Sequence, residues 1–305
     1  MKIDKKNGNV NYNDEEHIYW DESGNYISVT TLIGKYENEY DKDFWSSYKA
    51  LQELLTPEQF KFEKKFLLQT KKVDVQYFLD AYQINETNFN LVKQNILDKW
   101  QRENKASCDR GTRIHAELEK MYTTKKETDL KKFGLGGKFK VNTNETLDCN
   151  NIKLLDIDKG IFPEYLIYSV SKDGIVKIAG QIDLLIKDGD DIIIYDYKTN
   201  KKIDDTSYFD FNTKKNQMMK YPLNNLMDCN KMHYAMQLST YAWMLQKLNP
   251  NFKIKYLGII HYDHDNNVTE YEIPYLKKDV ERMLKDYKKK LIIKQREDSR
   301  KPIVF

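Results

Sequence analysis

Three strand-like runs joined by tight turns constrain the fold of this chain most strongly. Residues 164–171, 175–187 and 191–198 are rich in β-branched and aromatic residues and are bounded by turn residues, so each is predicted to be a β-strand. Residues 173–174 (Asp-Gly) and 188–190 (Asp-Gly-Asp) are the predicted turns. Strands joined by turns this short pair antiparallel, so we expect an antiparallel meander.

Helical patterns lie before and after the meander. Residues 42–106 combine helical spacing with many charges, and Thr56-Pro57-Glu58 is a sequence typical of a helix start. Residues 231–249 form a strong amphipathic pattern, and residues 275–296 predict a last, very basic helix. Short strands are also predicted over three ranges, residues 9–33, 252–263 and 267–274.

These elements predict an α/β (α+β) fold with a mixed central β-sheet flanked by helices. We divide the chain into an N-terminal strand and helical region, residues 1–106, and a core, residues 107–305. Residues 199–230 have mixed polarity and weak periodicity, so we expect an insertion or flap there.

The charge balance excludes one way of binding nucleic acid. The 305 residues include 50 basic and 47 acidic side chains, a net charge of +3, so bulk positive charge does not hold this chain to a polyanion. A local basic surface is needed instead. The basic residues between 277 and 301 either contact phosphates or form a solvated helix face.

Cysteine spacing and hydropathy limit other classes. The three cysteines, Cys108, Cys149 and Cys229, form no CxxC pair, which excludes a zinc ribbon or a four-cysteine iron–sulfur cluster within this chain. The sequence begins with a polar segment and contains no 18-residue apolar run. We therefore expect a cytoplasmic location and no membrane partner.

Charged residues interrupt the apolar pattern of the second and third meander strands. Asp183 lies among apolar residues in the second strand, and Asp196 and Lys198 share one face of the third. Two carboxylates on neighbouring strands repel each other unless a cation lies between them. Oxygen ligands of this kind suit Mg²⁺ or Mn²⁺, although a lone D-x-K is more commonly a salt bridge at a strand end.

Two helical motifs add candidate residues. His115 follows Gly111 by one helical turn, and the glycine lets the start of that helix approach another backbone closely. Gln237 and Tyr241 are four residues apart and share a helix face. That pair suits phosphate contact or orientation of a catalytic lysine, but each motif alone also fits an ordinary packed helix.

Taken in order, the motifs G-xxx-H, G-xx-D, D-x-K and Q-xxx-Y resemble the RecB-like branch of the PD-(D/E)XK nuclease superfamily. They are Gly111-Thr-Arg-Ile-His115, Gly180-Gln-Ile-Asp183, Asp196-Tyr-Lys198 and Gln237-Leu-Ser-Thr-Tyr241. The chain is similar in particular to phage-encoded and mitochondrial-genome-maintenance-type exonucleases. The branch of the family that holds an iron–sulfur cluster is not matched.

The resemblance implies a role for each residue. Asp183 and Asp196 would ligate one or two Mg²⁺ or Mn²⁺ ions, with His115 and the backbone carbonyl of Tyr197 as further ligands. Lys198 would position and help activate the attacking water, so His115, Asp183, Asp196 and Lys198 form the expected catalytic set. A supporting or DNA-binding role is implied for four residues, Gly111, Glu164, Gln237 and Tyr241.

The implied activity is hydrolysis of phosphodiester bonds in single-stranded DNA or at DNA ends. The resemblance places it in phage-like replication, recombination or repair, in the cytoplasm of a bacterial host. Residues 42–106 would confine the strand, or they form an ordinary packing layer. A structure-specific endonuclease and a non-catalytic nucleic-acid-binding scaffold stay open as alternatives, although a scaffold has no need of an acid–acid–lysine set.

Overall fold

The computed structural model describes most of the chain, namely residues 2–124, 127–129, 138–142, 154–210, 213–265 and 267–299. Cys149 lies outside these ranges, as do Arg300 and Lys301 at the end of the predicted basic segment.

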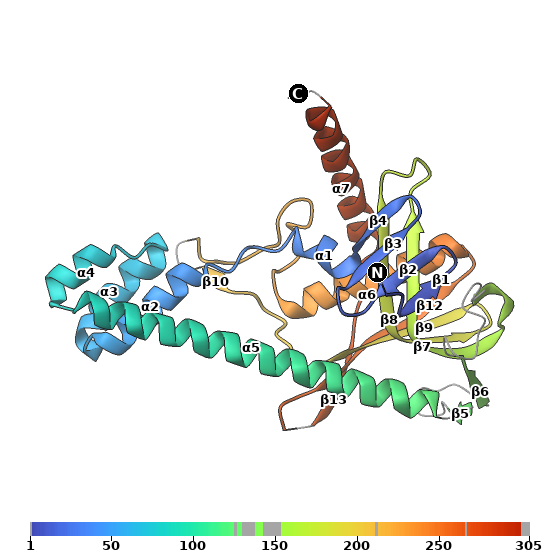
Figure 1. Cartoon of the computed structure of the whole chain (residues 1–305), viewed down its shortest axis with the longest axis horizontal. Helices are drawn as coiled ribbons and strands as arrows, with labels where there is room; N and C mark the ends of the chain where they lie inside the picture. Colours follow the sequence, from blue (N-terminus) through green and yellow to red (C-terminus); the bar gives the residue numbers. More distant parts are fainter. Residues whose placement is uncertain are drawn as a thin grey trace. The chain divides into compact units, whose positions relative to one another are not determined.

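The chain forms two compact units, which are labelled by element in Figure 1. Unit 1 comprises Met1–Glu37, Gly111–Thr206 and Met218–Phe305, and unit 2 comprises Asn38–Arg110 and Ser207–Gln217. This division differs in two ways from the one predicted from the sequence, which placed the boundary after residue 106. The first 37 residues belong with the large sheet, and a short part of the 199–230 segment belongs with the helices.

The predicted antiparallel meander is confirmed in unit 1. It consists of β7 (Lys159–Val170), β8 (Lys177–Asp188) and β9 (Asp191–Lys198). The first strand begins five residues earlier than predicted, so Glu164 lies inside β7 rather than at its start.

Strands from distant parts of the sequence extend the meander into a mixed sheet, as predicted. β4 (Gly24–Ser28) pairs in parallel with the beginning of β8, and β12 (Lys253–Tyr262) pairs in parallel with β9. The sheet has eleven strands within the described residues. The remaining six are β1 (Lys5–Asn7), β2 (Val10–Asn13), β3 (Ile18–Asp21), β5 (Glu127–Asp129), β6 (Lys138–Val141) and β13 (Val268–Glu272).

Helices cover both faces of β9, which explains its continuous apolar run. Ile192 and Ile194 pack in one cluster with Leu238 of α6 (Asn230–Leu248). Ile193 and Tyr195, whose side chains point the other way, pack in a second cluster with the C-terminal part of α5 (Glu86–Thr123). A strand buried on both faces has no alternating polar positions, so a polar residue within it requires a specific partner.

Within its described residues, unit 1 also contains α1 (Val29–Gly34), α7 (Lys277–Asp298) and a short 3₁₀ helix, Leu154–Asp156. The prediction that Val29–Ile33 continues a strand was wrong. Ser28 caps the helix instead, because its hydroxyl accepts a hydrogen bond from the backbone N–H of Thr31 at 3.0 Å.

Unit 2 is helical, as the pattern over residues 42–106 predicts. Its helices are α2 (Lys42–Leu54), α3 (Pro57–Thr70), α4 (Val75–Tyr82) and the N-terminal part of α5. The predicted helix start at Thr56 is confirmed, with Gln59 completing a reciprocal capping pair. Two short strands, β10 (Phe209–Asp210) and β11 (Lys215–Asn216), join these helices.

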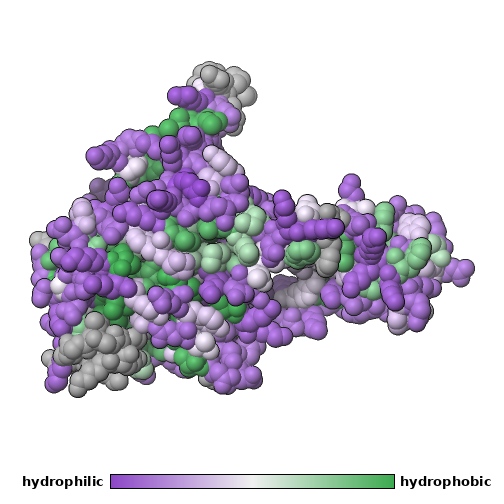
Figure 2. All heavy atoms as spheres, turned by 180° about the vertical axis from the view of Figure 1, so that it is seen from behind, coloured by the Kyte–Doolittle hydropathy of each residue, from purple (hydrophilic) through white to green (hydrophobic). Residues whose placement is uncertain are grey.

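Apolar side chains are mostly enclosed, and the face seen in Figure 2 is largely hydrophilic with small hydrophobic areas between. Among the described residues, no helix has both the length and the apolar character needed to cross a bilayer.

Candidate metal centre and active site

Helix α5 carries His115 to the end of β9. The helix begins 25 residues before Gly111, so the prediction that Gly111 starts a helix was wrong. A Cβ atom at Gly111 would lie 3.2 Å from the Thr199 hydroxyl, so the glycine allows α5 to pass close to the end of β9. The close approach that the motif predicted is therefore present, although it occurs in the middle of a helix.

His115 is held by the backbone of Tyr197. Its Nε2 atom lies 3.1 Å from the Tyr197 carbonyl oxygen. A carbonyl only accepts hydrogen bonds, so Nε2 carries the proton. Nδ1 faces Asp183, 3.6 Å from its Oδ2 atom. This is the way in which metal-binding histidines are commonly fixed, with one nitrogen bonded to a carbonyl and the other directed at the site.

Asp183 lies where β8 and β9 separate. The last regular pair of these strands at this end is Leu184 with Tyr195, and continuing the register would place Asp183 opposite Asp196. The Tyr197 backbone N–H instead donates to Asp183 Oδ2 at 2.7 Å. One residue, Tyr197, thus orients both Asp183 and His115 through its backbone.

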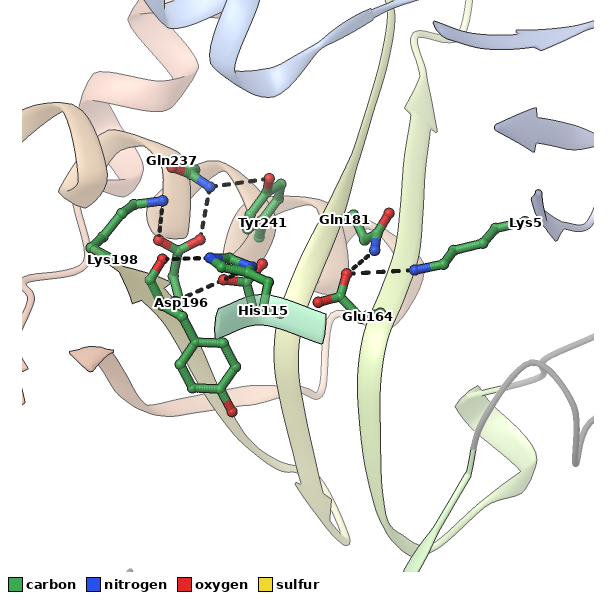
Figure 3. A network of polar contacts seen from close by, with 10 residues as sticks. Lys5, His115, Glu164, Gln181, Asp196, Lys198, Gln237 and Tyr241 are labelled. Atoms are coloured by element: carbon green, nitrogen blue, oxygen red, sulfur yellow. Dashed lines mark hydrogen bonds and ion pairs between the residues drawn. The ribbon is translucent and has the colours of Figure 1, made fainter. Parts of the chain in front are cut away.

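Glu164 brings a second carboxylate to Asp183 from the other side. The flanking pairs of β7 and β8 place Glu164 opposite Asp183, and Glu164 has a positive φ of 51°. Such a backbone costs energy for a residue with a Cβ atom. Gln181 donates to Glu164, and the Lys5 ammonium of β1 lies 3.5 Å from Glu164 Oε2 (Figure 3).

His115, Glu164 and Asp183 together fit a divalent cation. Each offers one ligand atom, and these three atoms lie within 4.8 Å of one another. Burial, and next the charge of Asp183, raise the pKa of Glu164 to about 8. Burial, and next the charge of Asp196, raise the pKa of Asp183 to about 6. A divalent cation beside these acids would stabilise their ionised forms.

A second network lies beside this cluster, on the face of β9 that α6 covers (Figure 3). Asp196, 1 % exposed, forms an ion pair with Lys198 and accepts a hydrogen bond from Gln237 Nε2 at 2.9 Å. Burial lowers the pKa of Lys198, but the charges of Asp196 and Asp183 raise it more, and the net shift is upward. Lys198 therefore stays protonated at neutral pH.

Gly180 explains how Tyr241 reaches this network. A Cβ atom at Gly180 would lie 2.5 Å from Cε1 of Tyr241, so no larger residue fits under the ring. The Tyr241 hydroxyl accepts from Gln237 Nε2 at 3.4 Å, and burial raises the pKa of this phenol well above its usual value. The helical Q-xxx-Y pair and the strand glycine of G-xx-D therefore pack against each other.

The structure brings the motif residues of the sequence together in one region of unit 1. Asp196 and Tyr197 lie next to the His115, Glu164 and Asp183 cluster rather than in it, and the Tyr197 carbonyl contacts His115. Glu164, expected in a supporting position, belongs to the cluster. Two residues near the cluster, Gln181 and Lys5, were not predicted from the sequence. Gln181 lies inside the G-xx-D motif and could have been considered, whereas Lys5 lies in a polar segment with no local signal.

Several lysines of α7 have partners within the chain. Lys288 pairs with Asp173, and Lys290 pairs with Asp286 at 2.7 Å. The phosphate-binding role of this helix stays a prediction.

Two acids on neighbouring strands of a mixed sheet, with a lysine two residues after one of them, are the arrangement expected of a metal-dependent nuclease core. The comparisons agree. The family model of the PD-(D/E)XK nuclease superfamily matches residues 136–301, just over half of the chain, and the chain belongs to this superfamily. Nucleases of this superfamily use divalent metals and act on nucleic acid. The match begins after His115, so the family model does not cover that residue.

Other comparisons add little. A search of curated proteins found no match. Ten chains of solved structures match. One of these, described as "Crystal structure of SSO0001", is 21 % identical to this chain, with 44 % of this chain and 50 % of that chain covered and a TM-score of 0.26. The alignment thus spans about half the length of that protein.

Proposed function

We propose that this protein is a Mg²⁺- or Mn²⁺-dependent deoxyribonuclease, and specifically an exonuclease that hydrolyses single-stranded DNA or DNA ends. The observation that supports this most directly is the meeting of His115, Glu164 and Asp183 beside the Asp196–Lys198 pair. The resemblance to phage exonucleases supports a role in phage-like replication, recombination or repair inside a bacterial host.

His115, Glu164 and Asp183 would hold the metal, with Asp196 contributing charge from the neighbouring strand. A bound divalent ion stabilises negative charge on phosphoryl oxygens and favours ionisation of water. Lys198 supplies a further positive charge, and Asp196 and Gln237 restrict where that charge lies. Our proposal is that Lys198 orients the attacking water next to the scissile phosphate.

Glu164 has two polar neighbours. Gln181 donates to it, and Lys5 partly balances its charge. The motifs supply no serine or cysteine paired with a base, so we propose direct hydrolysis without a covalent intermediate.

A structure-specific endonuclease of the same fold is the first alternative, and a non-catalytic scaffold is the second. Carboxylates buried close to one another are costly unless a cation or a catalytic role compensates. Their presence favours a catalytic protein over a scaffold.

The mode of cleavage is tested with labelled linear single strands, linear duplexes and a closed single-stranded circle, each in Mg²⁺, Mn²⁺ or EDTA. We expect the linear single strand to be degraded with metal, and the circle of the same sequence to survive. Rapid cutting of the circle would favour the endonuclease. DNA binding without cleavage under any of these conditions would favour the scaffold.

The metal site is tested by calorimetric titration with Mn²⁺. We expect Asp183→Asn to weaken binding more than tenfold, because it removes a ligand, and Asp196→Asn to weaken it strongly through lost charge. Asp190→Asn, in the exposed turn between β8 and β9, is the matched control and should bind as the wild type does. Unchanged binding by Asp196→Asn would remove Asp196 from the metal site.

A further inference from the structure

Unit 2 contains a cavity of about 720 Å³ that the nuclease site does not involve. Most of its lining comes from α5, and Tyr40 and Lys42 close it from the start of α2. The lining residues are Tyr40, Lys42, Leu97, Trp100, Gln101, Asn104 and Lys105. Ligand sites are typically roughly 300–1,000 Å³, so the size is that of a binding site.

Tyr40 and Trp100 give the cavity an aromatic wall. Tyr40 is 58 % exposed although it is a large aromatic residue. Its ring lies nearly parallel to Trp45, with centroids 6.5 Å apart and an interplanar angle of 8°. It meets Trp100 edge-on, with centroids 6.0 Å apart at 69°. Neighbouring rings hold Tyr40 in place, so its open face is available without further ordering.

The polar residues that line the cavity carry either a positive charge or a side-chain amide. Lys42 and Lys105 supply positive charge, and none of the seven lining residues is acidic. Gln101 and Asn104 each carry a donor and an acceptor suited to a base edge. Leu97, Gln101, Asn104 and Lys105 stand at positions i, i+4, i+7 and i+8 of α5, which groups them on one side of the helix.

We propose that this cavity binds unpaired bases of single-stranded DNA. Bases stack on Tyr40 and Trp100, the amides of Gln101 and Asn104 contact base edges, and Lys42 and Lys105 contact the flanking phosphates. Aromatic stacking with nearby lysines is how proteins bind unpaired strands with little sequence preference. Paired bases are stacked within a duplex and do not reach such a wall, so the site selects single strands. The choice of DNA as the ligand rests on the proposed function.

The test measures binding of fluorescein-labelled oligothymidylate in EDTA, where no cleavage occurs, with a duplex of equal length as a second probe. Stacking contributes roughly 1–3 kcal/mol per base, so we expect Tyr40→Ala to raise the Kd for oligothymidylate by about 5-fold or more. The Kd for the duplex should stay unchanged. Phe62→Ala, which removes another exposed aromatic side chain of unit 2 (78 % exposed), is the matched control and should bind as the wild type does.

The contribution of Lys42 and Lys105 is tested by a separate measurement, the salt dependence of binding. For single strands each lost phosphate contact reduces the slope of log Kd against log salt by roughly 0.7. We expect this reduction for Lys42→Ala and for Lys105→Ala, and not for Lys64→Ala, an exposed lysine of α3. Trp100→Phe should also lose part of the quenching of tryptophan fluorescence that oligothymidylate produces.

The outcomes separate this inference from the proposed function. If the wild type degrades DNA with metal but Tyr40→Ala binds oligothymidylate as tightly as Phe62→Ala does, the base-stacking site is overturned and the nuclease stands. If the wild type cleaves nothing while Tyr40→Ala and both lysine variants bind more weakly, the site stands and the nuclease does not.

Discussion

Glu164 and Asp183 lie opposite each other on β7 and β8, at a point where the backbone of Glu164 has a positive φ of 51°. Regular pairs flank them on both sides, so the irregularity is confined to this position. Strain of this kind persists where the surrounding structure enforces it, and it is often found at functional sites. Here it coincides with two acids whose pKa values are both raised, that of Glu164 partly by the charge of Asp183.

The first prediction concerns stability and pH without metal. The pKa of Glu164 is raised to about 8 and that of Asp183 to about 6, both above their values in an unfolded chain. Well below pH 4 both acids are protonated in the folded and in the unfolded state, so the pair costs nothing. As pH rises from there to 8 the unfolded state loses its protons first, so the free energy of unfolding falls.

We therefore expect the Tm in EDTA to be several degrees lower at pH 8 than at pH 5.5, and Mn²⁺ to restore it at pH 8. Glu164→Gln should flatten this dependence, whereas Glu16→Gln, on the exposed N-terminal turn, should not. Thermal unfolding followed by circular dichroism measures these Tm values. If the Tm without metal instead rises between pH 5.5 and 8, and rises equally in the wild type and in Glu164→Gln, then Glu164 and Asp183 do not set the pH dependence of stability.

The sheet could be predicted from the sequence because its signals are local. Turn residues bounded β7, β8 and β9, and helical spacing identified α6 and α7. The site could be predicted only as separate motifs, since their meeting depends on long-range packing. Lys5 and Glu164 are 159 positions apart, and no periodicity links them. The helix at Val29 was missed because its β-branched sequence favours a strand locally, whereas Ser28 provides the cap that decides the outcome.

The second prediction concerns Lys198. Its ammonium is charged at neutral pH and lies on the Asp196 carboxylate. If it acts on the attacking water, Lys198→Ala should lower kcat on linear single-stranded DNA by about 100-fold or more, with little change in the Kd for DNA measured in EDTA. Lys202→Ala, at an exposed lysine four residues further on, should match the wild type. A loss of binding in proportion to turnover would make Lys198 a phosphate contact instead.

The third prediction concerns Gly180. Gly180→Ala places a methyl group 2.5 Å from the Tyr241 ring, so the ring must move away from β8. We expect a loss of stability of roughly 1–3 kcal/mol and a fall in kcat, because Gln237 then loses its Tyr241 contact and orients Asp196 less well. Urea unfolding and DNA turnover measure the two effects. Gly34→Ala, where nothing lies within 4 Å of the added carbon, is the control. Wild-type stability and turnover in Gly180→Ala would show that Tyr241 packing does not position the network.

The last prediction concerns Lys5, a cation that β1 brings to the acids. Its ammonium lies 3.5 Å from Glu164 and 4.0 Å from Glu119, so it balances part of the charge that a metal would balance. Lys5 and a divalent cation therefore compete for Glu164. We expect Lys5→Ala to lower the Kd for Mn²⁺ severalfold in calorimetry, because the acids then lack their alternative partner. Lys2→Ala, at a lysine that pairs with Asp4 and is 81 % exposed, should leave the Kd unchanged. Weaker Mn²⁺ binding in Lys5→Ala would mean that Lys5 holds Glu164 in its ligating position rather than competing for it.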